Sequence, residues 1–405
     1  MKIVFVNRFF YPDHSATSQL LTDLTIHLVQ QGLDVKVLTS RLISDNSQIV
    51  QSRTDTLHGV EIVRMWSTRF GRQRLLGRTL DYLTFYVSTL WHLLSSARKD
   101  VLIITKTDPP LISVLGAIVS RIRGAVLVNW IQDLFPEVAS AIAIDGAQWF
   151  ERPLRAIRNR TLLIAKRNVV IGDGMAQKLV REGIPPERIC VIHNWADGSA
   201  IHPIAHENNE LRTQWKLHDK FVVGYSGNFG RAHEFDTILE AADLLRQEKD
   251  IVFLFIGGGA QLSSMKRTIQ EKALDNVIFK PYQPRDRLAL SLSVSDIHVI
   301  SLLPALEGLI VPSKFYGIAA ARRPMLYIGD THGEIPLLIQ SGQCGVTVSP
   351  FDARKAADFV LTLTQDRPMC RLMGTKARTL FDQRFEKAYA VEHWQREIVA
   401  TMQPR

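Results

Sequence analysis

Short runs of apolar, mostly β-branched residues alternate along the chain with longer segments of helical periodicity. Several runs are apolar at every position, which is typical of parallel strands covered on both faces. The predicted strands are residues 2–6, 34–39, 60–65, 101–105, 125–131, 168–171 and 189–193 in the first half, and residues 221–225, 251–256, 277–279, 297–301, 325–328 and 346–348 in the second. Because helix-length segments separate these strands, the pattern predicts βαβ units and an α/β fold.

A polar stretch with glycine and proline, NWADGSAIHPIAHENN at residues 194–209, separates the two series of strands. Its composition and lack of periodicity are typical of an interdomain linker. The chain of 405 residues is also too long for one ordinary core. We therefore expect two doubly wound, Rossmann-like domains, residues 1–197 and 198–384, that face a central cleft. In such sheets, ligands bind beyond the carboxyl ends of the strands.

The net charge of +9 lies mostly in the first half of the chain. Residues 1–200 hold 24 Lys and Arg against 17 Asp and Glu, whereas residues 201–405 hold 25 against 23. A basic half fits an anionic membrane surface, nucleic acid, or a role in solubility alone. Nucleic acid is disfavoured, because no reading motif is recognisable and few aromatic residues sit within the basic clusters.

The three cysteines, Cys190, Cys344 and Cys370, lie far apart and have no CxxC spacing. This argues against a disulfide framework and a cysteine zinc site, and it indicates a reducing compartment. The apolar run at the N-terminus ends at Arg8, which is too short for a signal peptide. We therefore expect a cytoplasmic protein.

The loop after the first predicted strand reads NRFFYPDHSATSQLL, residues 7–21. A helix is expected to begin within residues 15–18 and to bury the leucines of residues 20–28, and Asp13 and Ser15 are candidate N-caps. A long loop of small polar residues can present backbone N–H groups to an anion or a sugar. An ordinary loop with a helix cap is the alternative. The loop is not a GxGxxG motif, so it does not support a dinucleotide fold.

A second loop, QDLFPE at residues 132–137, follows the strand predicted at 125–131. Asp133 comes just past the end of an apolar parallel strand, where a side chain projects into the expected cleft. Its carboxylate could stabilise developing positive charge or orient a hydroxyl group. The alternative is that Asp133 caps the next helix.

The strongest signal is FVVGYSGNFGR at residues 221–231, a buried strand followed by a turn with Gly227, Gly230 and Arg231. Glycines let a bulky ligand approach the backbone, and the arginine offers a planar fork suited to phosphate. A glycine-rich turn with a surface arginine is the alternative.

A further segment, LEGLIVPSKF at residues 306–315, would complete this site. Pro312 and Ser313 make a good helix start, and backbone N–H groups there could hold a diphosphate together with the ammonium of Lys314. Arg231 and Lys314 would then neutralise a leaving nucleoside diphosphate without a metal. No DxD motif is present, and the acids of EFD at residues 234–236 are better explained by the helix dipole.

Three weaker signals follow later strands. Gly258, within the triple glycine at residues 257–259, could admit a phosphate or could only form a tight turn. Tyr282 could wall a nucleobase pocket or could be a plain core aromatic. Glu334 could accept hydrogen bonds from ribose hydroxyls or could only favour the N-terminus of a helix.

Together these segments resemble the GT-B glycosyltransferases of family 4, the glycosyltransferase group 1 superfamily, and within it the colanic-acid-type bacterial polysaccharide enzymes. The resemblance spans nearly the whole chain. Its motifs are KIVFVNRFFYPDHSATSQLLTDLTIHLVQQGLDVKVLT, WIQDLFPE, VVIGDGMAQKLVREGIPPERICVIHNWAD, YSGNFGRAHEFDTILEAA, FLFIGGGAQL and LEGLIVPSKFYGIAAARRP.

The resemblance implies a retaining transferase that uses a nucleotide-sugar donor, needs neither metal nor other cofactor, and acts on a lipid-linked, polyprenyl-diphosphate saccharide. In this family the donor binds mainly in the C-terminal domain and the acceptor in the N-terminal one, and a C-terminal helix, here about residues 385–405, packs back on the first domain. The resemblance places Arg231 and Lys314 on the donor diphosphate, and Asp133 at the strand end used for catalysis. The implied donor-binding residues are Gly227, Asn228, Gly230, Gly258, Tyr282, Glu307, Gly308, Leu309, Pro312, Ser313 and Glu334, and the implied acceptor-binding residues are Asp13, His14, Ser15 and Thr17.

The chain departs from the family pattern in three places. The first loop is not glycine-rich, and the usual lysine after the arginine is replaced by His233 and Glu234. The paired glutamates, E-x7-E, are incomplete, because Phe315 and Gly317 stand where the second glutamate is expected after Glu307. Ribose recognition is therefore expected to fall to Glu334.

A membrane contact is a separate expectation from the first half. The uncharged, apolar-rich segment at residues 82–97 is too short to span a bilayer, but basic residues flank it. The two basic clusters are Arg64, Arg69, Arg72, Arg74 and Arg78, and Arg152, Arg155, Arg158, Arg160, Lys166 and Arg167. Basic residues beside an aromatic, apolar helix are typical of reversible contact with an anionic membrane. A buried helix with a solvated basic loop is the alternative.

Two other functions remain open from the sequence. One is a nucleotide-sugar epimerase or a soluble glycoside synthase on the same scaffold. The other is a non-catalytic module that binds a nucleotide sugar or nucleic acid. Incubation with a panel of nucleotide sugars separates them, because transfer, epimerisation and binding without turnover give different products.

Overall fold

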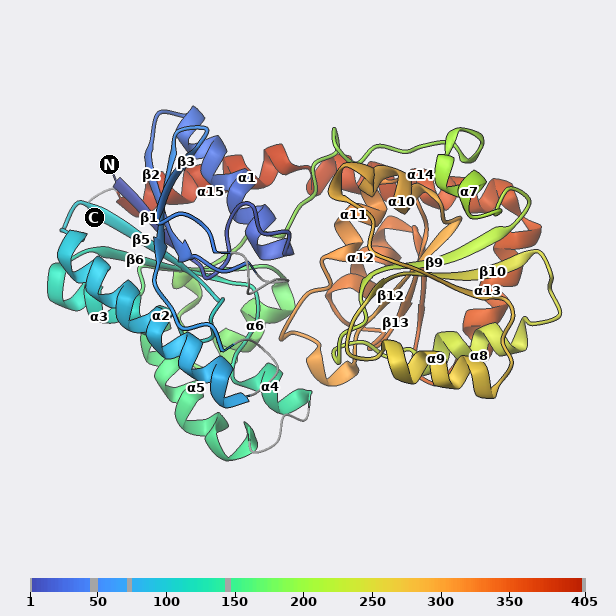
Figure 1. Cartoon of the computed structure of the whole chain (residues 1–405), viewed down its shortest axis with the longest axis horizontal. Coiled ribbons are helices and arrows are strands. Elements are labelled where there is room, and N and C mark those ends of the chain that lie inside the picture. The colour runs from blue at the N-terminus through green and yellow to red at the C-terminus, as the bar shows by residue number, and fades with distance from the viewer. Residues whose placement is uncertain (1, 44–49, 71–74, 143–146, 403–405) are drawn as a thin grey trace. The chain divides into compact units, whose positions relative to one another are not determined.

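The computed structural model describes residues 2–43, 50–70, 75–142 and 147–402 (Figure 1). The chain forms two compact units, of which the first contains residues 1–193 and 390–405 and the second contains residues 194–389. Each unit is built around one largely parallel sheet with helices packed against it. The alternation of short apolar strands with helical segments therefore produces the predicted α/β architecture in each unit.

The sheet of the first unit has the strand order β3-β4-β2-β1-β5-β6-β7-β8. Its strands are β1 (Lys2–Val6), β2 (Asp34–Ser40), β3 (Thr54–Leu57), β4 (Val60–Met65), β5 (Val101–Lys106), β6 (Val126–Ile131), β7 (Arg167–Val170) and β8 (Ile189–Val191). Only β3 runs antiparallel to its described neighbour, β4. The strands predicted in this half are confirmed. The sequence pattern does not predict β3, because its sequence TDTL carries a single apolar side chain.

The first unit's helices cover its sheet. They are α1 (Ala16–Gln30), α2 (Leu75–Ser96), α3 (Ser113–Arg123), α4 (Glu137–Ala141), α5 (Ala147–Ile164), α6 (Asp173–Arg181), the 3-10 turn η1 (Pro186–Arg188) and most of α15 (Lys387–Met402). On one face, Val4, Ile103 and Leu127 pack with Phe85 of α2 and Leu115 of α3. Helix α1 buries the leucines of residues 20–28, as its periodicity predicts.

The sheet of the second unit has the order β11-β10-β9-β12-β13-β14, and its described pairs are all parallel. Its strands are β9 (Phe221–Asn228), β10 (Ile251–Gly258), β11 (Val277–Lys280), β12 (Ile297–Ser301), β13 (Met325–Ile328) and β14 (Gly345–Val348). Its helices are α7 (Glu210–Gln214), α8 (Asp236–Leu244), α9 (Leu262–Glu271), α10 (Leu288–Ser293), α11 (Lys314–Ala320), α12 (Glu334–Gly342), α13 (Ala353–Gln365) and α14 (Arg367–Arg384), with 3-10 turns η2 (His206–Asn208), η3 (Arg285–Arg287) and η4 (Pro304–Leu306). The strands predicted in this half are confirmed.

Strands β9 and β10 extend beyond their predicted ends into glycine-containing sequence. In the parallel register, Gly257 pairs with Gly227 and Gly258 pairs with Asn228. A Cβ on Gly257 would lie 2.1 Å from the carbonyl oxygen of Gly227, so the close approach of the two strands requires glycine there. The apolar pattern stops where the glycines begin, which is why it underestimates the length of both strands.

Aromatic side chains pack together at the carboxyl ends of β9 and β10. Tyr225 contacts Phe235 edge-on with ring centroids 5.0 Å apart, and Phe229 lies 5.9 Å from Phe235. Phe255 stacks on Phe279 at 5.5 Å. Such pairs add to the free energy of burial. The cluster therefore gives rigid support to the backbone that carries Gly227.

The end of the chain packs on the first unit from residue 390 onward. The ring of Trp394 is buried, and its centroid lies 4.7 Å from that of Trp130 in β6. Gln395 Oε1 lies 3.2 Å from His27 Nε2 in α1. These contacts attach α15 to the sheet and to the first helix of this unit.

The two predicted basic clusters are only partly at the surface. Arg64 is buried and pairs with Asp55 at 3.2 Å. Arg158 is buried between Glu137 and Glu182. The expectation that these two arginines belong to exposed basic clusters is therefore wrong, because acids within the fold neutralise their charges. Arg69, Arg152 and Arg160 are exposed, whereas Arg72 and Arg74 lie outside the described residues.

None of the helices that the structure describes is long and apolar enough to cross a bilayer.

Candidate functional site

Lys314 is a half-buried cation in the second unit. It is the first residue of α11, and its ammonium lies 4.8 Å from the ring centre of Tyr225. Among the residues that the structure describes, it has neither a carboxylate partner nor a hydrogen bond. Burial lowers the pKa of Lys314 to about 8. An ammonium without a counterion is electrostatically incomplete, so an anion brought close to it would be strongly stabilised.

Gly227 makes the space in which the Lys314 side chain lies. Its φ is +133°, a conformation that side-chain-bearing residues rarely adopt. A Cβ there would lie 2.7 Å from Cε of Lys314 and 3.2 Å from its Nζ. The structure therefore brings together Gly227 and Lys314, two residues that the sequence assigns to one diphosphate site.

Arg231 lies in the turn between β9 and α8, where it is exposed. Within the described part of the chain its guanidinium has no hydrogen bond or ion pair, so it is available to a ligand. His233, two residues on, donates from Nδ1 to the carbonyl oxygen of Ser301 at 2.6 Å. Burial and then the charge of Lys314 lower the pKa of His233 to about 4, so this imidazole is neutral at pH 7.

Glu234 caps the helix that follows this turn. Its Oε1 accepts a hydrogen bond from the backbone N–H of Thr237 at 2.8 Å, and Ser301 Oγ accepts one from the N–H of Glu234 at 2.7 Å. Burial raises the pKa of Glu234. These contacts agree with the expectation that the acids of residues 234–236 stabilise the N-terminus of α8.

Asn228, Gly258 and Tyr282 lie together at the ends of β9, β10 and β11. The Tyr282 hydroxyl donates to the carbonyl oxygen of Gly258 at 3.1 Å, and its ring lies 3.7 Å from where a Cβ of Gly258 would stand. Tyr282 is 58% exposed, so its interpretation as a plain core aromatic is wrong. A Cβ on Gly230 would lie 3.0 Å from Nδ2 of Asn228, which places that glycine beside the same group.

Glu307 and Glu334 meet at the N-terminus of α12. Glu307 Oε1 accepts a hydrogen bond from the N–H of Glu334 at 2.9 Å. Its carboxyl fills the space above Gly333, where a Cβ would lie 2.1 Å from the carboxyl carbon. Burial raises the pKa of Glu307, and the hydrogen bonds from Glu334 and Gly308 oppose that shift. Glu307 therefore has a structural partner in addition to any ligand.

The segment between η4 and α11 holds the other expected donor-binding residues. Gly308 has a φ of +71°, and Leu309 is buried. Pro312 is half-buried and Ser313 is exposed, directly before the first residue of α11. The helix start expected there is confirmed.

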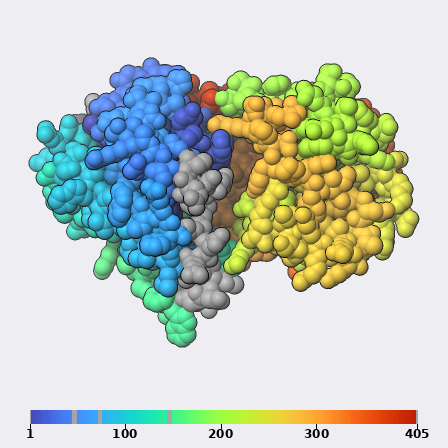
Figure 2. All heavy atoms as spheres, in the orientation of Figure 1, coloured from blue at the N-terminus to red at the C-terminus, as the bar shows by residue number. Residues whose placement is uncertain are grey.

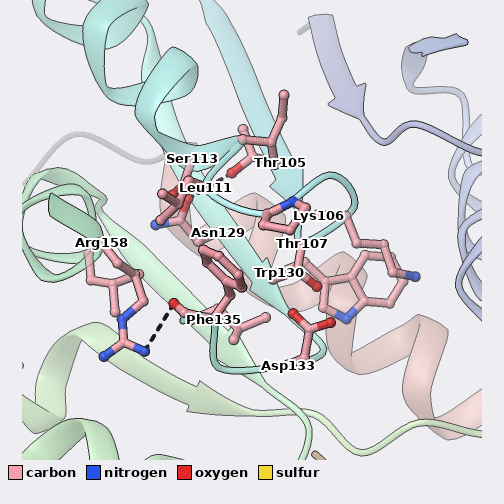
Figure 3. Close-up of a pocket in the computed structure, with 14 residues that line it drawn as sticks. Thr105, Lys106, Thr107, Leu111, Ser113, Asn129, Trp130, Asp133, Phe135 and Arg158 are labelled. Atoms are coloured by element: carbon pink, nitrogen blue, oxygen red, sulfur yellow. Dashed lines mark hydrogen bonds between the residues drawn. The ribbon is translucent and has the colours of Figure 1, made fainter. Parts of the chain in front are cut away.

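Asp133 lies in a pocket of the first unit that is lined in part by Lys106, Thr107, Trp130 and Arg158 (Figure 3). Burial raises the pKa of Asp133 to about 7; the nearby Asp108 adds to the rise, and a hydrogen bond from Thr107 opposes it. The next helix, α4, has Pro136 at its N-cap and no side-chain cap. The alternative in which Asp133 caps that helix is therefore wrong.

The first loop also lies at the carboxyl end of this sheet. Asp13 is buried, and its Oδ1 accepts a hydrogen bond from the N–H of Ser15 at 2.8 Å. Ser15 is the N-cap residue of α1, but its buried hydroxyl finds no partner among the described residues. His14 is exposed and Thr17 is half-buried. The loop thus places polar groups beside the start of α1.

The sequence did not single out Lys106, which links the first loop to the pocket. Its ammonium is buried, donates to the carbonyl oxygen of Thr17 at 2.8 Å and lies 3.6 Å from the ring centre of Trp130. Burial places the pKa of Lys106 well below its usual range. A charged residue at the end of an apolar strand was the available signal, and it is the same signal that identified Asp133.

Family comparison divides the chain in the same two parts. Residues 17–195 match the glycosyl transferase 4-like domain, and residues 207–380 match the glycosyl transferases group 1 family. The glycosyltransferase WbjE of Pseudomonas aeruginosa is 27% identical over 333 residues, which is 80% of each chain. The colanic acid biosynthesis glycosyl transferase WcaI of Escherichia coli K12 is 24% identical over 352 residues, or 84% of this chain and 86% of its own.

Solved structures share the fold across the whole chain. Sucrose-phosphate synthase from Thermosynechococcus elongatus has a TM-score of 0.80 at 16% identity and covers 99% of both chains. HepE from Anabaena, solved in complex with UDP-glucose, has a TM-score of 0.74 at 15% identity and covers 99% of this chain and 100% of its own. WaaG, involved in lipopolysaccharide biosynthesis, has a TM-score of 0.70 at 13% identity and covers 96% of this chain and 98% of its own.

Proposed function

Because the chain belongs to the group 1 glycosyltransferases and has the GT-B fold, we propose that it transfers a sugar from a nucleotide-diphosphate sugar to a lipid-linked saccharide during synthesis of a bacterial surface polysaccharide. The observation that carries this proposal is the half-buried ammonium of Lys314, which lacks a counterion within the described residues and lies over the glycine end of β9. A diphosphate would supply the missing negative charge.

The second unit would hold the donor. Arg231 and Lys314 would neutralise the charge that develops on the leaving nucleoside diphosphate, so this step would need no metal ion. Tyr282 offers an exposed ring for the base. Glu307 and Glu334 bring carboxyl groups to one helix start, where they would accept hydrogen bonds from sugar or ribose hydroxyls.

The first unit would supply the acceptor side. With a pKa of about 7, Asp133 exchanges its proton near neutral pH, which suits a group that orients or deprotonates a hydroxyl. Retention of configuration at the transferred sugar is what the family resemblance implies. The surface-polysaccharide context rests on the likeness to WcaI, whose own name assigns it to colanic acid biosynthesis.

A lipid-linked acceptor requires contact with a membrane, and α2 has a suitable surface. One stripe of its exposed side chains is apolar, namely Leu76, Leu80, Leu83, Val87 and Trp91. Helix α3 packs against both α2 and α5 and exposes Ile122, and α5 exposes Trp149 and Phe150. Figure 2 shows α2, in light blue, on the visible face of the first unit. The exposed arginines of this unit would add attraction to anionic lipid.

The direct test is to incubate the purified chain with UDP- and GDP-sugars and a lipid extract that contains polyprenyl-diphosphate saccharides. Transfer of labelled sugar to lipid supports the proposal, and Lys314→Met should lower the turnover by about 100-fold or more. Epimerisation of the donor without an acceptor, or tight binding without turnover, would replace it with one of the alternatives.

A further inference from the structure

Arg8 is a buried cation of the first unit that has no counterion among the described residues. It lies two residues beyond the end of β1 and is 4% exposed, and its Nε and Nη1 have no hydrogen-bond partner among the described residues. The guanidinium carbon lies 4.5 Å from the ring centre of Tyr82 in α2 and 5.2 Å from that of Phe9. The guanidinium is therefore in contact with two aromatic rings, and its Nε and Nη1 donors are not used in hydrogen bonds.

The other buried arginines of this unit, among the residues that the structure describes, pair with acids. Arg64 pairs with Asp55 at 3.2 Å, and Arg158 pairs with Glu137 at 2.8 Å and also with Glu182. The same fold thus supplies carboxylates to the neighbouring arginines and withholds one from Arg8. This difference sets Arg8 apart from a structural ion pair.

Aromatic contacts do not replace the hydration that a guanidinium loses on burial. A cation–π contact recovers part of that cost, but the buried N–H groups still need acceptors. Asp108 and Arg8 both act electrostatically on the hydroxyl of Tyr86, so this acid lies in the neighbourhood of Arg8. Even so, no carboxylate among the described residues lies within ion-pair distance of Arg8. An incoming anion would supply the missing acceptors.

The position of Arg8 agrees with a ligand-binding role. It lies at the carboxyl end of a central parallel strand, where ligands bind in sheets of this kind. The ring on which it stacks belongs to α2, the helix whose outer face exposes Leu83, Val87 and Trp91. A ligand on Arg8 would therefore lie beside the surface proposed to contact the membrane.

We propose that Arg8 binds a phosphate of the lipid-linked acceptor, so that the anionic end of the lipid is held at the end of β1. A guanidinium fork matches phosphate oxygens with two parallel hydrogen bonds. The identity of the lipid rests on the proposed function, whereas the binding of a phosphate group does not. Free pyrophosphate shares this chemistry, so the experiment must separate the two sources.

The test measures binding by calorimetry to the full chain, with inorganic pyrophosphate, farnesyl diphosphate and UDP as probes. The measurements with the first two probes use the Lys314→Met background, which removes one of the two cations of the proposed donor site. Arg8→Gln should weaken the binding of farnesyl diphosphate by at least about 10-fold, because one charged hydrogen bond is lost. It should leave UDP binding to the protein that retains Lys314 unchanged. Arg98→Gln, an exposed arginine of the same unit, is the matched control and should change neither.

Three results would overturn the proposal. They are unchanged farnesyl diphosphate affinity in Arg8→Gln, an equal loss in Arg98→Gln, and a loss confined to UDP. If Arg8→Gln weakens pyrophosphate binding, and if the Lys314→Met background binds pyrophosphate and farnesyl diphosphate equally well, the contact is made through the phosphate headgroup alone, which supports the proposal. Because none of these measurements needs sugar transfer, failure of the proposed enzyme activity would not mimic failure of this site.

A second measurement separates ligand binding from a structural role. If Arg8 is held for a ligand, removal of its unpaired charge in Arg8→Met should raise the melting temperature of the ligand-free protein. If its stacking on Tyr82 and Phe9 mainly stabilises the fold, the same variant should melt earlier. A lower melting temperature combined with unchanged farnesyl diphosphate binding would contradict the proposal.

Discussion

The ammonium of Lys314 reaches the ring of Tyr225 because Gly227, two residues further along β9, has no side chain to block it. We predict that Gly227→Ala weakens the binding of the preferred nucleoside diphosphate by about 10-fold or more. The new Cβ would lie 2.7 Å from Cε of Lys314, and the φ of +133° would also be strained. Titration calorimetry with UDP and GDP measures the effect.

The control for this variant is Gly183→Ala. Gly183 also has a positive φ, +88°, but an added Cβ would meet nothing within 4 Å. It should therefore show the backbone strain without the displacement of a cation. Equal nucleotide affinity in Gly227→Ala and the unmodified protein would mean that Lys314 does not need its present position.

The affinity for nucleoside diphosphate should fall as the pH rises through about 8. In the free protein, burial lowers the pKa of Lys314 to about 8, so the charged form is lost above that pH. A bound diphosphate favours the charged form, so the contribution of Lys314 to the affinity should be constant below pH 7 and should decline above pH 8. Lys314→Arg should bind with a flatter profile, because arginine stays charged throughout this range.

A steep decline that persists in Lys314→Arg would assign the titration to another group. His233 is not a candidate, since its pKa of about 4 leaves it neutral across this range. The nucleotide contributes its own ionisation near pH 6, so only the part of the profile above pH 7 is diagnostic.

The fold was predictable wherever apolar residues occur without interruption. Strand β12 is buried throughout and β1 is buried from its second residue onward, so their sequences differ sharply from their surroundings. Strand β3 escapes the pattern because it is polar and pairs only with β4. The glycine ends of β9 and β10 escape it because glycine carries no apolar signal, although the two strands remain paired.

The residues of the candidate site were predictable where a polar residue lies at the end of a strand or the start of a helix. They were not predictable where the role of a residue depends on a side chain that is distant in the sequence. Asp133 was found at the end of a strand, whereas Lys314 was found at the helix start that Pro312 and Ser313 predict. The contact of Glu307 with Glu334 depends on the adjacency of β12 and β13, which sequence spacing does not give. Likewise, Arg8 and Arg64 look alike in the sequence, and only the fold shows that Asp55 reaches one of them.

Turnover should rise with pH through about 7 if Asp133 acts in its ionised form. Burial raises the pKa of this carboxyl to about 7, so it is mostly protonated at pH 6 and mostly ionised at pH 8. Asp133→Asn should lose most of the turnover, lose this limb of the pH profile and keep its affinity for nucleotide. Near-normal turnover in that variant would contradict a catalytic role.

The same shift makes a prediction about stability. The folded pKa of Asp133 lies above its unfolded value of 3.8, so the folded state holds the proton more tightly. This contribution to stability is complete below about pH 4 and is lost as the pH rises to 7. Asp133→Asn should therefore melt at a higher temperature than the unmodified protein at pH 8, and the difference should shrink at pH 5.

Asp296 should be essential for the stability of the second unit. Its Oδ2 accepts a hydrogen bond from the N–H of Val222 at 2.8 Å and lies 3.3 Å from Nη1 of the buried Arg212, while Oδ1 accepts one from Arg367 at 2.8 Å. Asp296→Ala leaves a buried guanidinium without its counterion, and we expect a loss of about 3–5 kcal/mol in the free energy of unfolding.

Urea denaturation followed by circular dichroism measures that loss. The matched control is Asp286→Ala, an exposed aspartate of the same unit, which should change the free energy of unfolding by no more than about 0.5 kcal/mol. A change of similar size in both variants would show that the buried charges are solvated in some other way.

The exposed apolar stripe of α2 should determine binding to anionic vesicles. A triple variant, Leu83→Ser, Val87→Ser and Trp91→Ser, removes side chains of which Trp91 is 77% exposed. We expect its partition onto phosphatidylglycerol vesicles to fall by at least about 10-fold, because it loses the apolar surface that would enter the interface.

Leu372→Ser, an exposed leucine on α14 of the second unit, is the control and should bind like the unmodified protein. Salt should weaken binding of the unmodified protein, since the exposed arginines contribute through charge. Flotation of the triple variant equal to that of the unmodified protein would exclude this helix as the membrane contact.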